Sequence, residues 1–255
     1  MDTEMDKLII DALCRIHEGL SRKGPGSDAL ARRLIERIRP LLPEPPVVAD
    51  FGCGNGYCAY ILAEALGAEV TAVDFCPAFI DELKERLDKS PPKKGHIVPR
   101  VADMLTPGLE PECIDLAWSE GAVGSVGVRE SLKAWLPLLT PGGIVVFSDL
   151  CWFNRQPPEE VLAFFAEPYP GMATVGNQIR TAEELGYGFV HAELLPAADW
   201  WTSYFDPLAG RLRELEAHVE PGSVLAEVIR MAWVEQENFR RHSDHFGYLF
   251  LVLKK

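Results

Sequence analysis

The pattern of apolar and polar positions predicts a regular alternation of strands and helices through the middle of the chain. Short, nearly continuous apolar runs are typical of strands buried on both faces, as in a parallel sheet. We expect such strands near residues 47–51, 69–74, 96–101, 113–119 and 143–149. Segments with helical spacing separate them, and we expect helices near residues 57–66, 77–88 and 128–138. This alternation implies an α/β fold with a mostly parallel sheet and right-handed crossovers.

Further helices are predicted on both sides of this alternating region. Residues 5–20 and 27–39 have the pattern of two amphipathic helices, with Ser27 placed to cap the second one. Residues 197–243 are too many for a hairpin loop and have helical periodicity. In that segment Leu208 and its neighbours at helical spacing fall on one face, and a second helix is expected after residue 223.

The segment Val47–Gly56, VVADFGCGNG, carries the clearest chemical signal. Its apolar strand ends at Asp50, and glycines follow at positions 52, 54 and 56. Glycines at this point let the backbone turn sharply and approach a ligand closely. The helix predicted next would direct its free N–H groups at the same ligand. A strand, a glycine loop and a helix N-terminus together predict a binding site for a nucleoside cofactor.

Two classes of nucleoside cofactor fit this loop. The dinucleotide fingerprint G-x-G-x-x-G would need its third glycine at position 57, where the chain has Tyr57. The next predicted strand ends at Asp74, whose carboxylate can accept both hydrogen bonds of a ribose diol. An acid at that position serves NAD and S-adenosylmethionine (SAM) equally well, so Asp74 does not distinguish them.

The D-F-G-x-G-x-G loop resembles motif I of the class I SAM-dependent methyltransferases. Three further segments resemble that family in the same order, and the match covers roughly residues 45–150. Arg100–Met104 is similar to the segment whose acid binds the adenine amino group. Ile114–Glu120 is similar to the fourth strand, and Leu139–Phe147 is similar to the turn into strand five. Within the family, the chain most resembles uncharacterised bacterial members near the ubiquinone/menaquinone-type group.

This resemblance implies a Rossmann-like, seven-stranded, mostly parallel sheet with a closing hairpin, one strand of which is antiparallel. Residues 188–195 and 245–253 fit those two strands. The implied organisation is N-terminal lid helices at 1–45, a SAM-binding core at 46–195, a helical insertion and candidate substrate cap at 196–244, and the last core strand at 245–255.

The resemblance also implies a set of cofactor-binding residues. The glycines would line the cofactor, Asp74 would bind the ribose, Asp103 would lie near the adenine, and Asp50 would lie at the methionine end. The full implied set is Asp50, Gly52, Gly54, Asn55, Gly56, Asp74, Phe75, Asp103, Met104, Ser119 and Glu120.

Catalytic residues are harder to predict because SAM supplies its own leaving group, and the protein mainly positions two reactants. Glu120 and Trp152 are the candidates. Glu120 could orient the acceptor, act as a base or hold the cofactor amino group. Tyr204 could present its π face to a cationic group, or pack in the core. By the resemblance, His17 is a candidate lid residue.

Composition narrows the class of partner. The formal net charge of −13 argues against the phosphate backbone of nucleic acid as the main partner. Six cysteines show no C-x-x-C pair and no zinc-like spacing, so we expect free thiols, no metal site and a cytoplasmic location. The acidic segment MDTEMDKL lacks a signal-peptide pattern, and no apolar run is long enough to span a membrane.

We therefore expect an enzyme that transfers a methyl group from SAM to a small-molecule acceptor. Two alternatives are a non-catalytic SAM-binding protein and an NAD-dependent oxidoreductase.

Overall fold

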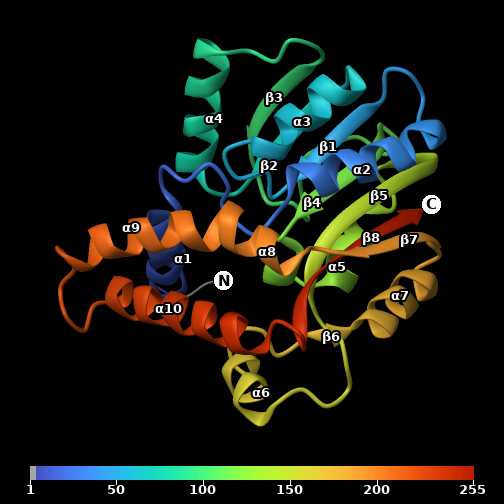
Figure 1. Ribbon diagram of the computed structural model, residues 1–255. Helices are drawn as coiled ribbons and strands as arrows, with labels where there is room; N and C mark the ends of the chain where they lie inside the picture. Colours follow the sequence, from blue (N-terminus) through green and yellow to red (C-terminus); the bar gives the residue numbers. More distant parts are fainter. Residues whose placement is uncertain (1–3) are drawn as a thin grey trace.

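The computed structural model describes residues 4–255 and is organised around one twisted sheet (Figure 1). The strands are β1 (Val47–Phe51), β2 (Glu69–Asp74), β3 (His96–Val101), β4 (Ile114–Glu120), β5 (Leu139–Trp152), β6 (Ala173–Thr174), β7 (Gly188–Leu194) and β8 (Phe246–Lys254). Seven of them lie in the order β3-β2-β1-β4-β5-β8-β7, and the two-residue β6 pairs with β5. Only β8 runs antiparallel to its neighbours β5 and β7 among the strands described. The predicted mostly parallel sheet with a closing hairpin is confirmed.

Helices cover both faces of this sheet. They are α1 (Glu4–His17), α2 (Asp28–Ile38), α3 (Tyr57–Leu66), α4 (Pro77–Lys89), α5 (Val128–Trp135), α6 (Glu159–Phe165), α7 (Val175–Glu184), α8 (Ala197–Trp200), α9 (Asp206–Glu216) and α10 (Val224–His242). A π-helical turn, Trp201–Phe205, joins α8 to α9. Residues of α2, α3 and α8–α10 pack on one face, and residues of α5 and α7 pack on the other.

Most predicted elements occur within a few residues of their expected positions. Ser27 caps α2 as predicted, because its hydroxyl accepts a hydrogen bond from the amide of Leu30. The predicted lid, residues 1–45, begins with residues 1–3, which lie outside the described residues. Its helix α1 packs against α9 and α10 (Figure 1). The N-terminal helices therefore meet the insertion that precedes the last strand.

Two predicted boundaries are wrong. The helix expected at 128–138 ends at Trp135, because Pro137 cannot continue it. The strand expected at 143–149 extends to Trp152, because β8 pairs with β5 as far as Phe246. Asp149 and Trp152 therefore lie inside β5 instead of following it.

Asn177 is near the start of α7 but does not cap it. It lies inside α7, and Thr174 is the capping residue, whose hydroxyl accepts a hydrogen bond from the Asn177 amide at 3.4 Å. The short elements α6 and β6 before it were not predicted.

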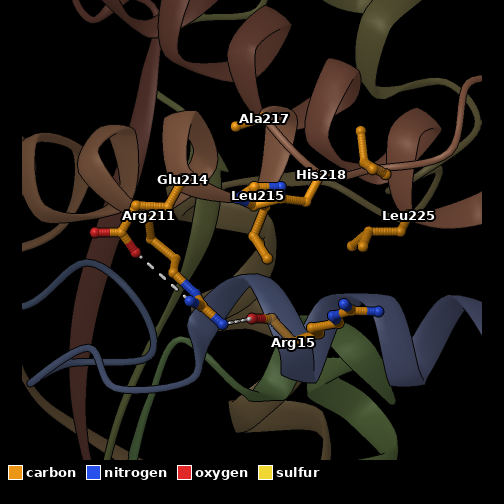
Figure 2. A pocket seen from close by; sticks show the side chains of 8 residues that line it. Arg15, Arg211, Glu214, Leu215, Ala217, His218 and Leu225 are labelled. Carbon is orange, nitrogen blue, oxygen red and sulfur yellow. Dashed lines mark hydrogen bonds and ion pairs between the residues drawn. The ribbon is translucent and has the colours of Figure 1, made fainter.

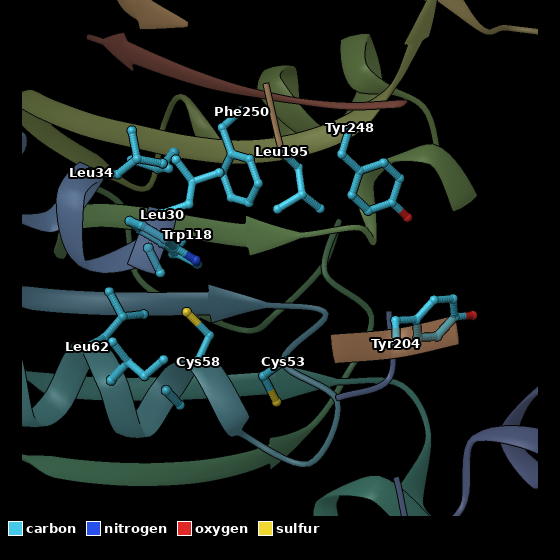
Figure 3. Packing of buried hydrophobic residues seen from close by; sticks show 14 of the residues in the cluster. Leu30, Leu34, Cys53, Cys58, Leu62, Trp118, Leu195, Tyr204, Tyr248 and Phe250 are labelled. Carbon is cyan, nitrogen blue, oxygen red and sulfur yellow. The ribbon is translucent and has the colours of Figure 1, made fainter. Parts of the chain in front are cut away.

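One hydrophobic cluster joins the helical insertion to the sheet. Trp118 of β4 and Phe250 of β8 share it with Leu62 of α3 and with Trp200 and Phe239 of the insertion. Figure 3 shows Trp118 and Phe250, whose strands β4 and β8 flank β5, with side chains of α2 and α3 packed around them. The insertion is thus packed on the core and is not separated from it by a polar layer.

Candidate functional site

The glycine loop lies at the carboxyl end of β1 and is held by Asp74. Gly54 has a φ of +55°, a backbone conformation that favours glycine, and its amide donates to Asp74 Oδ2 at 2.8 Å. The amide of Cys76 donates to Asp74 Oδ1 at 2.9 Å. Asp74 is 6% exposed, so a buried carboxylate holds the loop. Its predicted contact with a ribose diol would use the lone pairs that remain, and it stays a prediction.

Asp50 is the buried acid just before this loop. It is 1% exposed, and its Oδ2 has no hydrogen-bond partner among the described residues. Burial raises the pKa of Asp50 well above its ordinary value, and the neighbouring carboxylates of Glu120 and Asp74 raise it further. A buried oxygen without a partner is costly, and a donor on a ligand would satisfy it.

Apolar side chains are exposed where β2 and β3 end. Phe75 follows β2 and is 52% exposed, and Val101 at the end of β3 is 48% exposed. Asp103 is exposed beside them and accepts the amide of Leu105 at 2.8 Å. Met104 is buried. The predicted adenine residues therefore form an exposed apolar edge flanked by one carboxylate.

Glu120 is the last residue of β4 and receives donors on both oxygens. Its Oε1 accepts from Trp118 Nε1 at 3.1 Å and from Cys58 Sγ at 3.2 Å. Its Oε2 accepts from Arg22 Nη1 at 2.9 Å. The neighbouring Ser119 is fully buried, and its hydroxyl has no partner among the described residues. Arg22 was not predicted as a site residue.

Residues 18–27, here called the strap, connect α1 to α2 and lie against the glycine loop. Asn55 of the loop donates from Nδ2 to the carbonyl of Leu20 at 2.9 Å. A Cβ on Gly54 would lie 2.8 Å from Cγ of Lys23, so the lysine stem covers that glycine. The Lys23 ammonium pairs with Glu82 at 2.7 Å. The predicted cofactor residue Asn55 is thus bound to the strap.

A group of aromatic and phenolic side chains lies beside Glu120. Tyr248 OH would be 2.9 Å from a Cβ on Gly121, the residue after β4. Nε2 of His17 and the Tyr204 hydroxyl are 2.8 Å apart. In Figure 3 the rings of Tyr204 and Tyr248 lie beyond the arrowheads of the strands. Both predicted candidates His17 and Tyr204 are therefore brought together, from α1 and the π-helical turn.

Trp152 is placed differently from Glu120. It packs edge-on against Phe165 and Phe246 and is 9% exposed. It lies further along β5 than Ser148, which pairs with Glu120. The structure therefore places Trp152 in an aromatic cluster and does not bring it to Glu120.

Asp149, which is buried, and Glu235, which is half-buried, lie outside the predicted set of site residues. Asp149 accepts from Tyr169 OH at 2.5 Å and from Gln178 Nε2 at 2.9 Å, and burial raises its pKa to about 6. Burial raises the pKa of Glu235 on α10 to about 7, and its carboxyl in turn raises the pKa of Tyr204. A charged residue within the apolar run of β5 is a signal in the sequence that could have identified Asp149. Glu235 lies in a polar helical segment and gives none.

A separate pocket of about 340 Å³ lies between α1 and α9 (Figure 2). Arg211 crosses it and donates to the carbonyl of Arg15 at 3.4 Å. None of the predicted site residues lines this pocket.

The structure also bears on metals, thiols and membranes, within residues 4–255. All six cysteines are free thiols there. No group of three or more His, Cys, Asp or Glu side chains is arranged to bind a metal ion in this range. No helix in the same range combines the length and apolar character that crossing a bilayer would need.

Residues 48–143 match the model of a protein family described as "Methyltransferase domain". This match covers less than half of the chain. The sheet order and the glycine loop agree with the resemblance to the class I SAM-dependent methyltransferases, and membership of that group stays a prediction. The finer resemblance to the ubiquinone/menaquinone-type group stays a prediction.

The curated proteins that this chain resembles are distant relatives. Phosphoethanolamine N-methyltransferase 1 of Zea mays is 27% identical over 169 residues, which are 66% of this chain and 33% of that protein. Aklanonic acid methyltransferase DauC of Streptomyces sp. (strain C5) is 30% identical over 142 residues, 51% of this chain and 60% of that protein. The chain thus spans 33% to 60% of the length of these two curated relatives.

A solved structure shares the fold over nearly the whole chain. It is a SAM-dependent methyltransferase from Geobacter sulfurreducens in complex with S-adenosyl-L-homocysteine. Its TM-score is 0.77 at 18% sequence identity, and the match covers 95% of this chain and 97% of that one. The shared fold includes the strand ends where the predicted cofactor residues lie.

Proposed function

We propose that the protein transfers a methyl group from SAM to a small-molecule acceptor. The match of residues 48–143 to a methyltransferase domain supports this activity. The observation that carries it is the arrangement at the carboxyl ends of β1, β2 and β4. There a glycine loop, a buried oxygen of Asp50 without a partner and an exposed Phe75 lie on adjacent strands.

The residues present suit such a cofactor. Asp50 and Glu120 would hold the methionine end, because both are buried acids beside the loop. Asp74 would accept from the ribose, and Phe75 with Asp103 would hold the adenine. When bound, SAM supplies an activated methyl group on a sulfonium sulfur. The protein's own residues then have to orient the acceptor, exclude water and receive any proton that the acceptor releases.

We place the acceptor on the side of Glu120 that carries the phenols. Tyr248 lies over Gly121, and Tyr204 contacts His17. Glu235 of α10 lies near both tyrosines, because its carboxyl adds to the effect of burial in raising the pKa of each. The acceptor atom is left open. The acidic net charge and the free thiols support a small-molecule acceptor and a reducing, cytoplasmic location.

Isothermal titration with SAM, S-adenosylhomocysteine (SAH) and NAD in parallel tests the cofactor. We expect heat of binding with SAM and SAH and none with NAD. Binding of NAD alone would contradict the proposal and would revive the oxidoreductase alternative. Tight binding of SAM without methyl transfer to any member of a broad acceptor panel would favour the non-catalytic alternative.

A further inference from the structure

A buried ion pair joins the strap to the sheet beside the glycine loop. Nη1 of Arg22 donates to Oε2 of Glu120 at 2.9 Å, and the two side chains are 7% and 9% exposed. The second guanidinium nitrogen, Nη2, donates to Asp28 Oδ1 at 2.7 Å. The guanidinium also lies 4.3 Å from the centre of the Tyr57 ring, at the first residue of α3. Arg22 therefore connects the strap to α2, to β4 and to the helix that follows the glycine loop.

Arg22 is also the cation that faces both acids at the predicted methionine end. It lowers the pKa of Asp50 against the larger effect of burial, and it contacts Glu120 directly. Although burial opposes it, the carboxylates of Glu120 and Asp28 keep the pKa of Arg22 above its ordinary value. The guanidinium is thus charged, and Glu120 has it as its ionic partner.

The strap closes tightly over this ion pair. A Cβ on Gly26 would lie 2.4 Å from Arg22 Nη1 and 2.7 Å from Glu120 Oε2, so the backbone of the strap lies directly against both charged groups. The carbonyl of Gly26 accepts a hydrogen bond from Ser203 Oγ at 2.7 Å. The π-helical turn therefore holds the strap in the position that covers the pair.

The charges of this pair match those of an α-amino acid. Such a group carries an ammonium and a carboxylate on adjacent atoms. If it enters between the two side chains, Glu120 can receive the ammonium and Arg22 the carboxylate. One buried ion pair is then exchanged for two, and neither side chain is left charged without a partner. The hydrogen bonds of Glu120 Oε1 to Trp118 and Cys58 can persist.

We propose that the Arg22–Glu120 pair occupies the subsite for the amino-acid group of the cofactor, and that Arg22 binds its carboxylate once the pair separates. The inference rests on the proposed function, because it takes the ligand to be SAM or SAH. It adds to the cofactor site a residue that precedes the glycine loop by about thirty positions. It also requires the strap to shift, since Lys23 covers Gly54.

Isothermal titration with two ligands isolates this contact. SAH carries the amino-acid group, whereas 5′-methylthioadenosine has the same nucleoside and a thioether but lacks that group. We expect R22Q to weaken SAH binding roughly 10- to 100-fold, the range for a lost charge-assisted hydrogen bond. Binding of 5′-methylthioadenosine should be unchanged. The matched control is R33Q, because Arg33 pairs with Glu193 at the surface; it should alter neither affinity.

Unchanged SAH affinity in R22Q would overturn the proposal. An equal loss for both ligands would also overturn it, because Arg22 would then only position the strap. If circular dichroism shows that R22Q does not fold, the double variant R22Q/E120Q replaces it, since two amides can pair without a buried charge. We expect that variant to bind SAH more weakly than the wild type and to bind 5′-methylthioadenosine with unchanged affinity. Wild-type protein that binds neither ligand would refute the proposed function itself, and the subsite with it.

Discussion

Asp74 holds the glycine loop through two backbone amides, so its role in binding includes a role in loop geometry. Asp74→Ala removes both acceptors and leaves the amides of Gly54 and Cys76 buried without partners. We expect SAH binding to weaken by about 1–3 kcal/mol and the free energy of unfolding to fall by a similar amount. Titration calorimetry and urea unfolding measure the two effects. Asp74→Asn keeps one acceptor oxygen and should lie between. Unchanged SAH affinity in Asp74→Ala would show that the cofactor does not lie where we place it.

Asp149 should make stability depend on pH. Burial raises its pKa to about 6, against the hydrogen bond from Tyr169, whereas the unfolded carboxyl titrates near 3.8. The folded state therefore binds this proton more tightly. The protonated Asp149 therefore stabilises the folded state fully below pH 4, and this stabilisation is lost as pH rises to about 6. The free energy of unfolding falls by about 3 kcal/mol at most. The variant Asp149→Asn has no titrating group at this position, so it does not show this loss of stability.

The measurement is urea unfolding of the wild type and Asp149→Asn at pH 4.5, 5.5 and 6.5. The variant should gain stability relative to the wild type as pH rises, and the gain should level off above about pH 6.5. Burial lowers the pKa of His17 to about 4, so His17 gives the opposite slope in this window. It is present in both proteins, and its effect cancels in the difference. A difference that stays constant with pH would contradict the assigned pKa.

The sequence allowed Asp50 and Asp74 to be predicted because each ends an apolar strand, where a charge needs a partner or a function. Arg22 could not be predicted in the same way. It meets Glu120 across 98 positions of sequence, and only the folding of the strap over the sheet brings them together. Glu235 is a comparable case, since it affects the pKa of tyrosines on two other elements that are distant from it in sequence.

Elements with one strong local signal were predicted best. The strands β1 and β2 were expected at their observed bounds, because both are short apolar runs next to glycine or charge. The end of β5 depends on its antiparallel partner β8, which lies far along the chain, so its length was not predictable from local pattern. The helix α6 has seven residues and follows a proline, which gives a weak periodic signal.

The insertion helices owe their position to aromatic packing, and this leads to a prediction for α10. Phe239 is 1% exposed and stacks on Trp200 with ring centres 4.3 Å apart. Phe239→Ala should lower the free energy of unfolding by about 3–5 kcal/mol, the cost of a buried Phe replaced by Ala. Phe189→Ala is the matched control, because Phe189 is 45% exposed, and it should cost less than about 1 kcal/mol. Equal effects of the two substitutions in urea unfolding would mean that the α10 contact is not part of the core.

At the scale of the whole molecule, the lid, core and insertion are separate segments of the sequence, but their side chains pack into one core. Leu30 of α2, Val48 of β1 and Leu208 of α9 belong to one buried cluster. The strap also ties α1 to the sheet through Arg22 and to the π-helical turn through Gly26. These contacts predict one cooperative unit, although domain pattern alone suggests a separable cap.

Two probes and one ligand test that prediction. Far-ultraviolet circular dichroism reports mainly on the helices, and tryptophan fluorescence includes Trp118 and Trp135, which are buried on opposite faces of the sheet. We expect both urea transitions to coincide. SAH at about 100 times its dissociation constant should then shift both by the same amount, about 2.7 kcal/mol. If the insertion were an independent cap, the helical signal would show two phases, and the ligand would stabilise only the phase that contains the glycine loop. A ligand stabilises only the part of the protein that must unfold to release it. If both transitions coincide and shift together, the strap, the sheet and α10 therefore unfold as one cooperative unit.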